Sequence, residues 1–212
     1  EAARALVFNG DLDGAKGLLD RAADQDTTPA ARLARERGRL ALRYRDFKRA
    51  IVELKDSTTS DERDFEAWML LLDAHLGAGD TAAARTVMDD ILRKFPNRPD
   101  AGLVTGRVAL ISGRTQDALT DFKAAKASVV NAPRRTFADA CLWVGYAAYS
   151  VGDYANARVQ LVEATRKEET NADAHGVLGR VFVETEDWDK AAVTLARAVE
   201  LDPENAEAWF LL

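Results

Sequence analysis

Six alanines recur along this chain at a nearly constant spacing. They are Ala15, Ala50, Ala84, Ala118, Ala157 and Ala191. Four of the five steps between them are 34 or 35 residues long, and one is 39 residues long. A fixed period in this range is typical of a solenoid, in which one helical unit is stacked repeatedly. The spacing therefore predicts a repeat protein built from local contacts.

Other positions keep the same phase as the alanines. Four residues after each alanine stands a large apolar residue, and three residues further on stands a mostly small one. Because these offsets share one face of a helix, they predict its buried side. Twelve residues before each alanine is a mostly small position on a preceding helix, held by Ala3, Gly38, Leu72, Gly106, Gly145 and Gly179. Small residues on consecutive helices allow the close approach that an antiparallel pair requires.

The turn inside each helix pair is also repeated. Its aspartate is kept in the dipeptides Gly10-Asp11, Arg45-Asp46, Gly79-Asp80, Gly152-Asp153 and Glu186-Asp187. Glycine can end a helix in the left-handed conformation, and aspartate can cap the helix that follows. One unit has Gly113, Arg114 and Thr115 instead, and there we expect Thr115 to be the cap.

Two units carry the fullest version of a longer pattern. One has Trp68, Leu71, His75, Gly79-Asp80, Ala84, Met88 and Pro96, and the other has Leu178-Gly179, Phe182, Ala191, Leu195, Ala198 and Pro203. The pattern resembles the tetratricopeptide repeat (TPR) family, in which W-x2-L-G-x2-Y is followed by A-x3-F and then by A and P. The resemblance covers the whole chain. It implies an all-α fold, a right-handed α-solenoid of antiparallel helix pairs with about six repeats.

We expect one TPR solenoid domain over residues 1–212. Its repeats are expected at about 1–30 (partial), 31–64, 65–98, 99–137, 138–171 and 172–205, with the start of a further repeat at 206–212. Helices are expected near 2–9 (cut), 12–24, 31–44, 47–57, 65–78, 81–94, 99–112, 115–129, 137–151, 154–167, 172–185 and 188–201. The long step predicts an enlarged loop around 130–136. Both terminal repeats look cut, so we interpret the chain as a fragment of a longer array.

Net charge and cysteine content limit the classes of partner and the cellular compartments that suit this chain. The net charge of −6 argues against nucleic acid or an anionic membrane as the main partner. The longest uncharged run, Ala140–Gly152, is too short to span a bilayer. Cys141 is the single cysteine, which excludes an intrachain disulfide and fits a reducing compartment such as the cytoplasm. A periplasmic location stays open if a leader was removed.

The sequence contains no motif of an enzyme or a cofactor site. His75 and His175 stand in packing positions of their repeats, and Cys141 stands in a buried one. The zinc, phosphate-loop, dinucleotide and nucleophile-elbow motifs are absent. We therefore expect no catalytic residue, no metal and no cofactor.

Arginines recur at helical spacing early in the chain. The run comprises Arg32, Arg35, Arg39 and Arg43. Such a stripe can hold carboxylates or phosphates through paired hydrogen bonds. The alternative, which we favour, is a solvated face paired locally with Glu36 and Asp46.

The resemblance implies that the first helices of the repeats line a concave groove that binds a partner. The candidate groove residues are Arg35, Arg39, Met69, Asp73, Leu103, Arg107, Leu142, Trp143, Tyr146, Tyr149 and Arg180. The expected groove is basic at its N-terminal end and apolar to aromatic in the middle. Tyrosine and tryptophan commonly anchor interfaces. Some of these residues can instead fill the space between neighbouring first helices.

These features favour a non-enzymatic scaffold that binds a peptide or helix of a partner protein in its groove. Two alternatives stay open. The module can self-associate through its apolar groove, or it can be a regulatory or recruiting arm of a larger enzyme.

Overall fold

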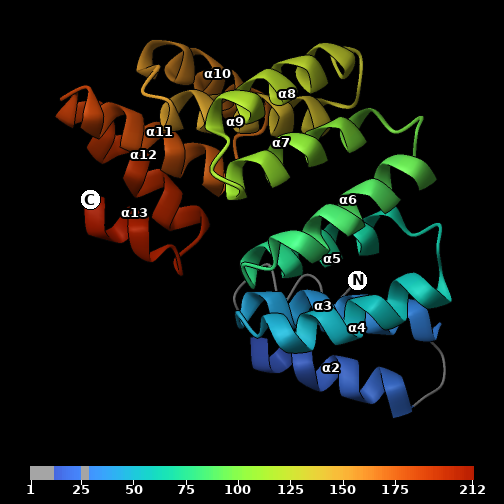
Figure 1. The fold of residues 1–212 in the computed structure, drawn as a ribbon. Helices are drawn as coiled ribbons and strands as arrows, with labels where there is room; N and C mark the ends of the chain where they lie inside the picture. The colour runs from blue at the N-terminus through green and yellow to red at the C-terminus, as the bar shows by residue number, and fades with distance from the viewer. Residues whose placement is uncertain (1–11, 25–28) are drawn as a thin grey trace. The chain divides into compact units, whose positions relative to one another are not determined.

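A computed structural model describes residues 12–24 and 29–212, and these form α-helices joined by short links with no β-strand among them. They divide into two compact units, which meet in the sequence between Pro96 and Asn97. Each unit is a succession of helices packed on their neighbours (Figure 1). The prediction of an all-α helical repeat is confirmed. The single domain over 1–212, with its repeat boundaries, stays a prediction.

The helices alternate between first and second members of a repeat. In unit 1 they are α2 (Leu12–Asp24), α3 (Ala30–Arg43), α4 (Phe47–Ser60), α5 (Phe65–Gly77) and α6 (Thr81–Lys94). In unit 2 they are a 3-10 turn (Pro99–Gly102), α7 (Leu103–Ile111), α8 (Thr115–Ser128), α9 (Arg134–Ser150), α10 (Tyr154–Lys167), α11 (Ala172–Glu184), α12 (Trp188–Leu201) and α13 (Ala206–Leu211). The odd-numbered helices from α3 onward are first helices, and the even-numbered ones are second helices.

The periodic alanines and the small positions before them form the contacts within each pair. All six alanines are buried. A Cβ added to Gly38 would lie 2.4 Å from Leu54 Cγ, and one added to Gly145 would lie 2.6 Å from Leu161 Cγ. Gly106 and Gly179 meet Phe122 and Leu195 in the same way. In these four pairs, the glycine of the first helix therefore receives the large apolar residue of the second helix.

The turns follow the expected chemistry except at Asp187, which precedes α12 without a side-chain cap bond, and at Thr115. Gly79 and Gly152 have φ values of 72° and 80°, and the aspartates after them accept hydrogen bonds from backbone N–H groups three residues on. Arg45 and Glu186 adopt the same left-handed conformation without being glycine. The expectation for Thr115 is wrong: Arg114 is the cap residue, without a side-chain bond, and Thr115 is already helical. Gly10-Asp11 and the helix expected near 2–9 lie outside the described residues.

Three segments differ from the expected helix boundaries, and the first is α4, which runs to Ser60 instead of ending near residue 57. Residues 99–102 form a 3-10 turn before α7 begins at Leu103. The 39-residue step between Ala118 and Ala157 mainly lengthens a helix. The chain turns α-helical again at Arg134, within the loop expected at 130–136, so α9 has 17 residues and the link from α8 is short.

Candidate functional site

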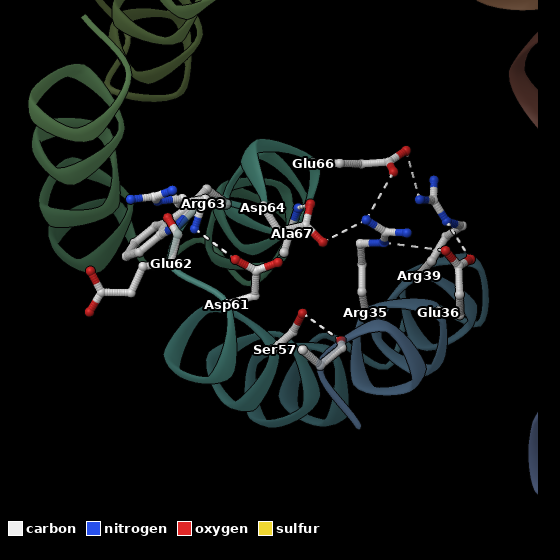
Figure 2. Close-up of polar contacts among 12 residues, drawn as sticks. Arg35, Glu36, Arg39, Ser57, Asp61, Glu62, Arg63, Asp64, Glu66 and Ala67 are labelled. Atoms are coloured by element: carbon white, nitrogen blue, oxygen red, sulfur yellow. Dashed lines mark hydrogen bonds and ion pairs between the residues drawn. The ribbon is translucent and has the colours of Figure 1, made fainter. Parts of the chain in front are cut away.

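In unit 1, two predicted groove arginines lie in a cluster of charged side chains. We call this set, formed by Arg35, Glu36, Arg39, Asp64 and Glu66, the charged cluster (Figure 2). Arg35 Nη1 lies 2.5 Å from Asp64 Oδ2 and 3.5 Å from a Glu66 carboxylate oxygen. Arg39 donates to Glu36 at 3.1 Å, and its Nη2 lies 2.8 Å from Glu66 Oε1. The cluster joins α3 to α5.

The local structure explains why Asp64 belongs to this cluster. Asp64 is the cap residue of α5, and its Oδ1 accepts a hydrogen bond from the Ala67 N–H at 3.1 Å. Its other oxygen is left to receive Arg35 (Figure 2). Burial alone would lower the pKa of the Arg35 guanidinium, but the carboxylates of Asp64, Glu66 and Glu36 outweigh that effect and raise the pKa. The positive charges of Arg35 and Arg39 are therefore balanced by carboxylates of the same chain.

In unit 2, three first helices bring aromatic rings and arginines together. We call Arg107, Trp143, Tyr146, Tyr149 and Arg180 the aromatic–arginine row. The Arg107 guanidinium lies 5.0 Å from the centroid of the Trp143 ring, and Trp143 meets Tyr146 edge to face at 6.2 Å. Arg180 lies 5.5 Å from the Tyr146 ring and 4.8 Å from the Tyr149 ring. Each such cation–π contact is attractive, so the row links α7, α9 and α11.

Further groups hold the aromatic–arginine row in place. Trp143 stacks on Phe122 of the core at 5.5 Å. Arg180 Nη1 lies 2.5 Å from Glu207 Oε1 of α13. The pKa of Arg180 is raised: burial opposes the rise, and the Glu207 carboxylate outweighs it. Burial is also the main reason why the pKa of the Tyr149 hydroxyl is raised.

The remaining predicted residues are placed differently. Leu103 and Leu142 are only 5% and 8% exposed and belong to the hydrophobic core of unit 2. Met69 and Asp73 lie half-buried on α5 of unit 1. In the arginine run, Arg35 and Arg39 pair with Glu36, whereas Asp46 caps α4. Arg32 and Arg43 are exposed.

Sequence reasoning missed a set of acidic residues that shares the repeat phase. We call Glu66, Asp100, Asp139, Asp173 and Glu207 the acidic column, and the first four each stand eighteen residues before the alanine of their repeat. In two places an arginine of one repeat pairs with the column residue of the next, as Arg39 does with Glu66 and Arg180 with Glu207. The two pairs have the same separation in the sequence. An alignment of the repeats on their alanines would therefore have predicted both ion pairs.

The reactive side chains lie in packing environments. Cys141 is fully buried, and burial raises the pKa of its thiol, which disfavours the reactive thiolate. His75 is 3% exposed, and burial lowers the pKa of its imidazole.

Among residues 12–24 and 29–212, no three or more His, Cys, Asp or Glu side chains gather as a metal site would need. None of the described helices has the length and apolar character needed to cross a membrane.

Two models of the tetratricopeptide repeat family match the chain. One matches residues 1–57, 37–99 and 69–135, and the other matches residues 148–212. The chain therefore belongs to the tetratricopeptide repeat family. Members of this family are generally non-enzymatic modules for interaction with proteins or peptides. The comparison with curated proteins found no match.

Several solved structures share the fold at low sequence identity. TTC0263, a thermophilic TPR protein of Thermus thermophilus, is 18% identical over 85% of this chain and 96% of its own, with a TM-score of 0.71. NprR in complex with its cognate peptide NprX is 14% identical over 99% of this chain and 69% of its own, with a TM-score of 0.74. YrrB, a TPR protein with an unusual peptide-binding site, is 18% identical over 91% of this chain and 96% of its own, with a TM-score of 0.51.

Proposed function

We propose that this protein is a non-enzymatic scaffold whose first helices in unit 2 receive a peptide or a helix of a partner protein. The aromatic–arginine row is the observation that carries the proposal. Trp143, Tyr146 and Tyr149 are half-buried on one helix, so each ring keeps some surface for a ligand. Large, rigid rings of this kind often supply most of the binding energy of an interface.

The internal pairing of the predicted groove arginines favours apolar anchors as the main determinant of binding. Arg35, Arg39 and Arg180 already pair with carboxylates of the chain. A partner's acidic side chain would have to compete with those carboxylates, and exposed ion pairs contribute little. We therefore assign the charged groups mainly to steering and orientation. Leu103 and Leu142 stabilise the repeat stack that presents the row.

The fold likeness supports this class of function. NprR is bound to its cognate peptide, and YrrB has a peptide-binding site. Their identity to this chain is below 20%, so they support a peptide or protein ligand without indicating its sequence.

The test replaces Tyr146 with alanine and measures affinity for a peptide selected on the wild-type protein. We expect binding to weaken by about 2 kcal/mol or more, the range of an interface hot spot, with a nearly unchanged Tm. Trp188→Ala is the matched control, because Trp188 is an exposed aromatic residue on the second helix α12. If Tyr146→Ala melts much earlier yet binds normally when folded, the row is core packing and the proposal fails.

A second candidate function is self-association, and one observation favours it. On α13, Trp209 and Phe210 are 55% and 87% exposed. Exposed apolar patches commonly mark interaction sites. Light scattering over a concentration series should show oligomers that Phe210→Ser abolishes. A monomer at all concentrations would exclude this alternative.

A further inference from the structure

A cavity of about 370 Å³ lies between the second helices α8 and α10, over α9. It is lined by Lys123, Lys126 and Ala127 of α8, Val130 of the α8–α9 link, Phe137 and Val144 of α9, and Gln160 of α10. We call it the insertion pocket, because the link and the early start of α9 belong to the one repeat that is five residues longer than its neighbours. The residues of the aromatic–arginine row are not among its lining.

The walls of the insertion pocket leave apolar surface in contact with water. Val130 is 62% exposed, although its neighbour Val129 is fully buried. Phe137 is half-buried, and Val144 lies at the base with 1% exposure. Covering such surface is favourable in proportion to its area. The size of the cavity suits one large aliphatic or aromatic side chain of a partner.

The rim of the insertion pocket is basic. The ammonium groups of Lys126 and Lys167 lie 5.1 and 5.5 Å from the Phe137 ring centroid. Lys126 also donates to Gln160 at 2.6 Å and to Glu163 at 3.1 Å, whereas Lys123 is exposed. The charged residues of the pocket lining are Lys123 and Lys126, in a chain whose net charge is −6. Because Lys126 already pairs with Glu163, Lys123 is the lysine of the rim that is placed to meet a ligand's charge.

We propose that the insertion pocket is a second binding site, for an acidic segment of a partner protein. One aromatic or aliphatic side chain of that segment fills the cavity, and a carboxylate beside it meets Lys123 at the rim. Charge complementarity selects an acidic partner. The apolar walls favour a protein side chain over a nucleic-acid backbone, which a row of exposed cations would recognise better. The site does not depend on the function proposed for the first helices.

The experiment selects binders from a library of short random peptides displayed on phage, with the whole chain as target. Ala127→Phe fills the cavity from its exposed rim, and Lys123→Glu reverses the charge of the rim. Ala124→Phe is the matched control, because Ala124 is also exposed on α8 but does not line the cavity. Circular dichroism and Tm measurements verify that all three variants are folded.

One class of selected peptides should combine Asp or Glu with a large apolar residue. Its affinity should fall about tenfold or more in Ala127→Phe and in Lys123→Glu, the size expected for a lost anchor. It should be unchanged in Ala124→Phe and in Tyr146→Ala. The proposal is overturned if no such class is enriched, or if its binding survives Ala127→Phe. It is also overturned if Ala127→Phe abolishes self-association in light scattering, because a second copy would then occupy the pocket.

Discussion

Asp139 is held in an environment that disfavours its charge. Burial, followed by the nearby Glu168 carboxylate, raises its pKa from 3.8 to about 6, with smaller contributions from Asp100 and Asp173, while Arg135 opposes the rise. The early start of α9 accounts for part of this environment. Other members of the acidic column lie in the first turn of their helices, where the helix dipole favours a negative charge. Asp139 lies deeper in α9, beyond that favourable position.

The raised pKa predicts that Asp139→Asn stabilises the protein at neutral pH. A carboxyl whose folded-state pKa is raised binds its proton more tightly in the folded state, so stability falls as the pH rises between about 4 and 6. We expect the variant to gain on the order of 1–2 kcal/mol at pH 7, since partial hydration reduces the effect. Urea unfolding across this pH range checks it. The fall in stability between about pH 4 and 6 should be smaller in Asp139→Asn than in the wild type. An equal fall in both proteins would refute the prediction.

Helix pairs depend on a close contact between a glycine and a large apolar residue. At Gly145, a Cβ would lie 2.6 Å from Leu161 Cγ, a distance at which the leucine must move. Leu161 is fully buried, so it has little room. The same contact recurs between Gly179 and Leu195. The small residue is therefore a packing requirement of the pair, which outweighs the low helix propensity of glycine.

We predict that Gly145→Ala destabilises the protein although alanine is the better helix former. Overpacking typically costs about 1–3 kcal/mol, which exceeds the gain of about 1 kcal/mol in helix propensity. The matched control is Gly17→Ala on α2, where no atom of the described residues outside its own helical turn lies within 4 Å of the added Cβ. This variant should be more stable than the wild type by about 0.5–1 kcal/mol. Denaturant unfolding of the two variants measures the difference. Equal effects of the same sign would contradict the packing argument.

The turns between the two helices of a pair contain residues in the left-handed backbone conformation. Glu186 holds a φ of 59°, where Gly152 stands in an equivalent turn with a φ of 80°. A left-handed conformation costs a non-glycine residue roughly 1–2 kcal/mol. Glu186→Gly should therefore raise the free energy of unfolding, by about 1 kcal/mol or less because glycine also loses more chain entropy. Gly152→Ala should do the opposite. A loss of stability in Glu186→Gly would show that the side chain contributes more than the strain costs.

Within each of the two units, a repeat contacts its neighbours along the sequence. Within unit 2, α9 packs on α8, α10 and α11, and within unit 1, α3 packs on α2, α4 and α5. In arrays of this kind, stability is approximately a sum of repeat terms and nearest-neighbour interface terms. Local opening can then occur without global unfolding.

This organisation predicts that a packing defect acts locally. In native-state hydrogen exchange, Gly145→Ala should speed amide exchange most in α9 and α10, less in α8 and α11, and least in α3 and α4. Gly38→Ala should give the reverse pattern, because its Cβ would meet Leu54 in the α3–α4 pair. Mass spectrometry of exchanged peptides resolves these regions. Uniform acceleration in either variant would show that the chain opens as one cooperative body.

The sequence alone was sufficient for the helical repeat and its internal contacts. The alanine period located the second helices, and the small residues twelve positions earlier located their partners on the first helices. The starts of α4, α6 and α10 follow from a capping aspartate, and the ends of α5, α7 and α9 follow from the glycine after them. These features were predictable because they depend on residues that are close in the chain, where helix geometry determines which side chains share a face.

The tertiary structure decided which side chains meet between neighbouring repeats. The sequence placed Arg39 and Arg180 on first helices, but their pairing with Glu66 and Glu207 depends on how successive helices stack. The same is true of the contact between Arg107 and Trp143 and of the burial of Leu103 and Leu142. The early start of α9, with the pocket beside it, depends on how an inserted segment packs. Periodicity fixes the phase of a helix, whereas the distance and angle between repeats come from side-chain packing over many residues at once.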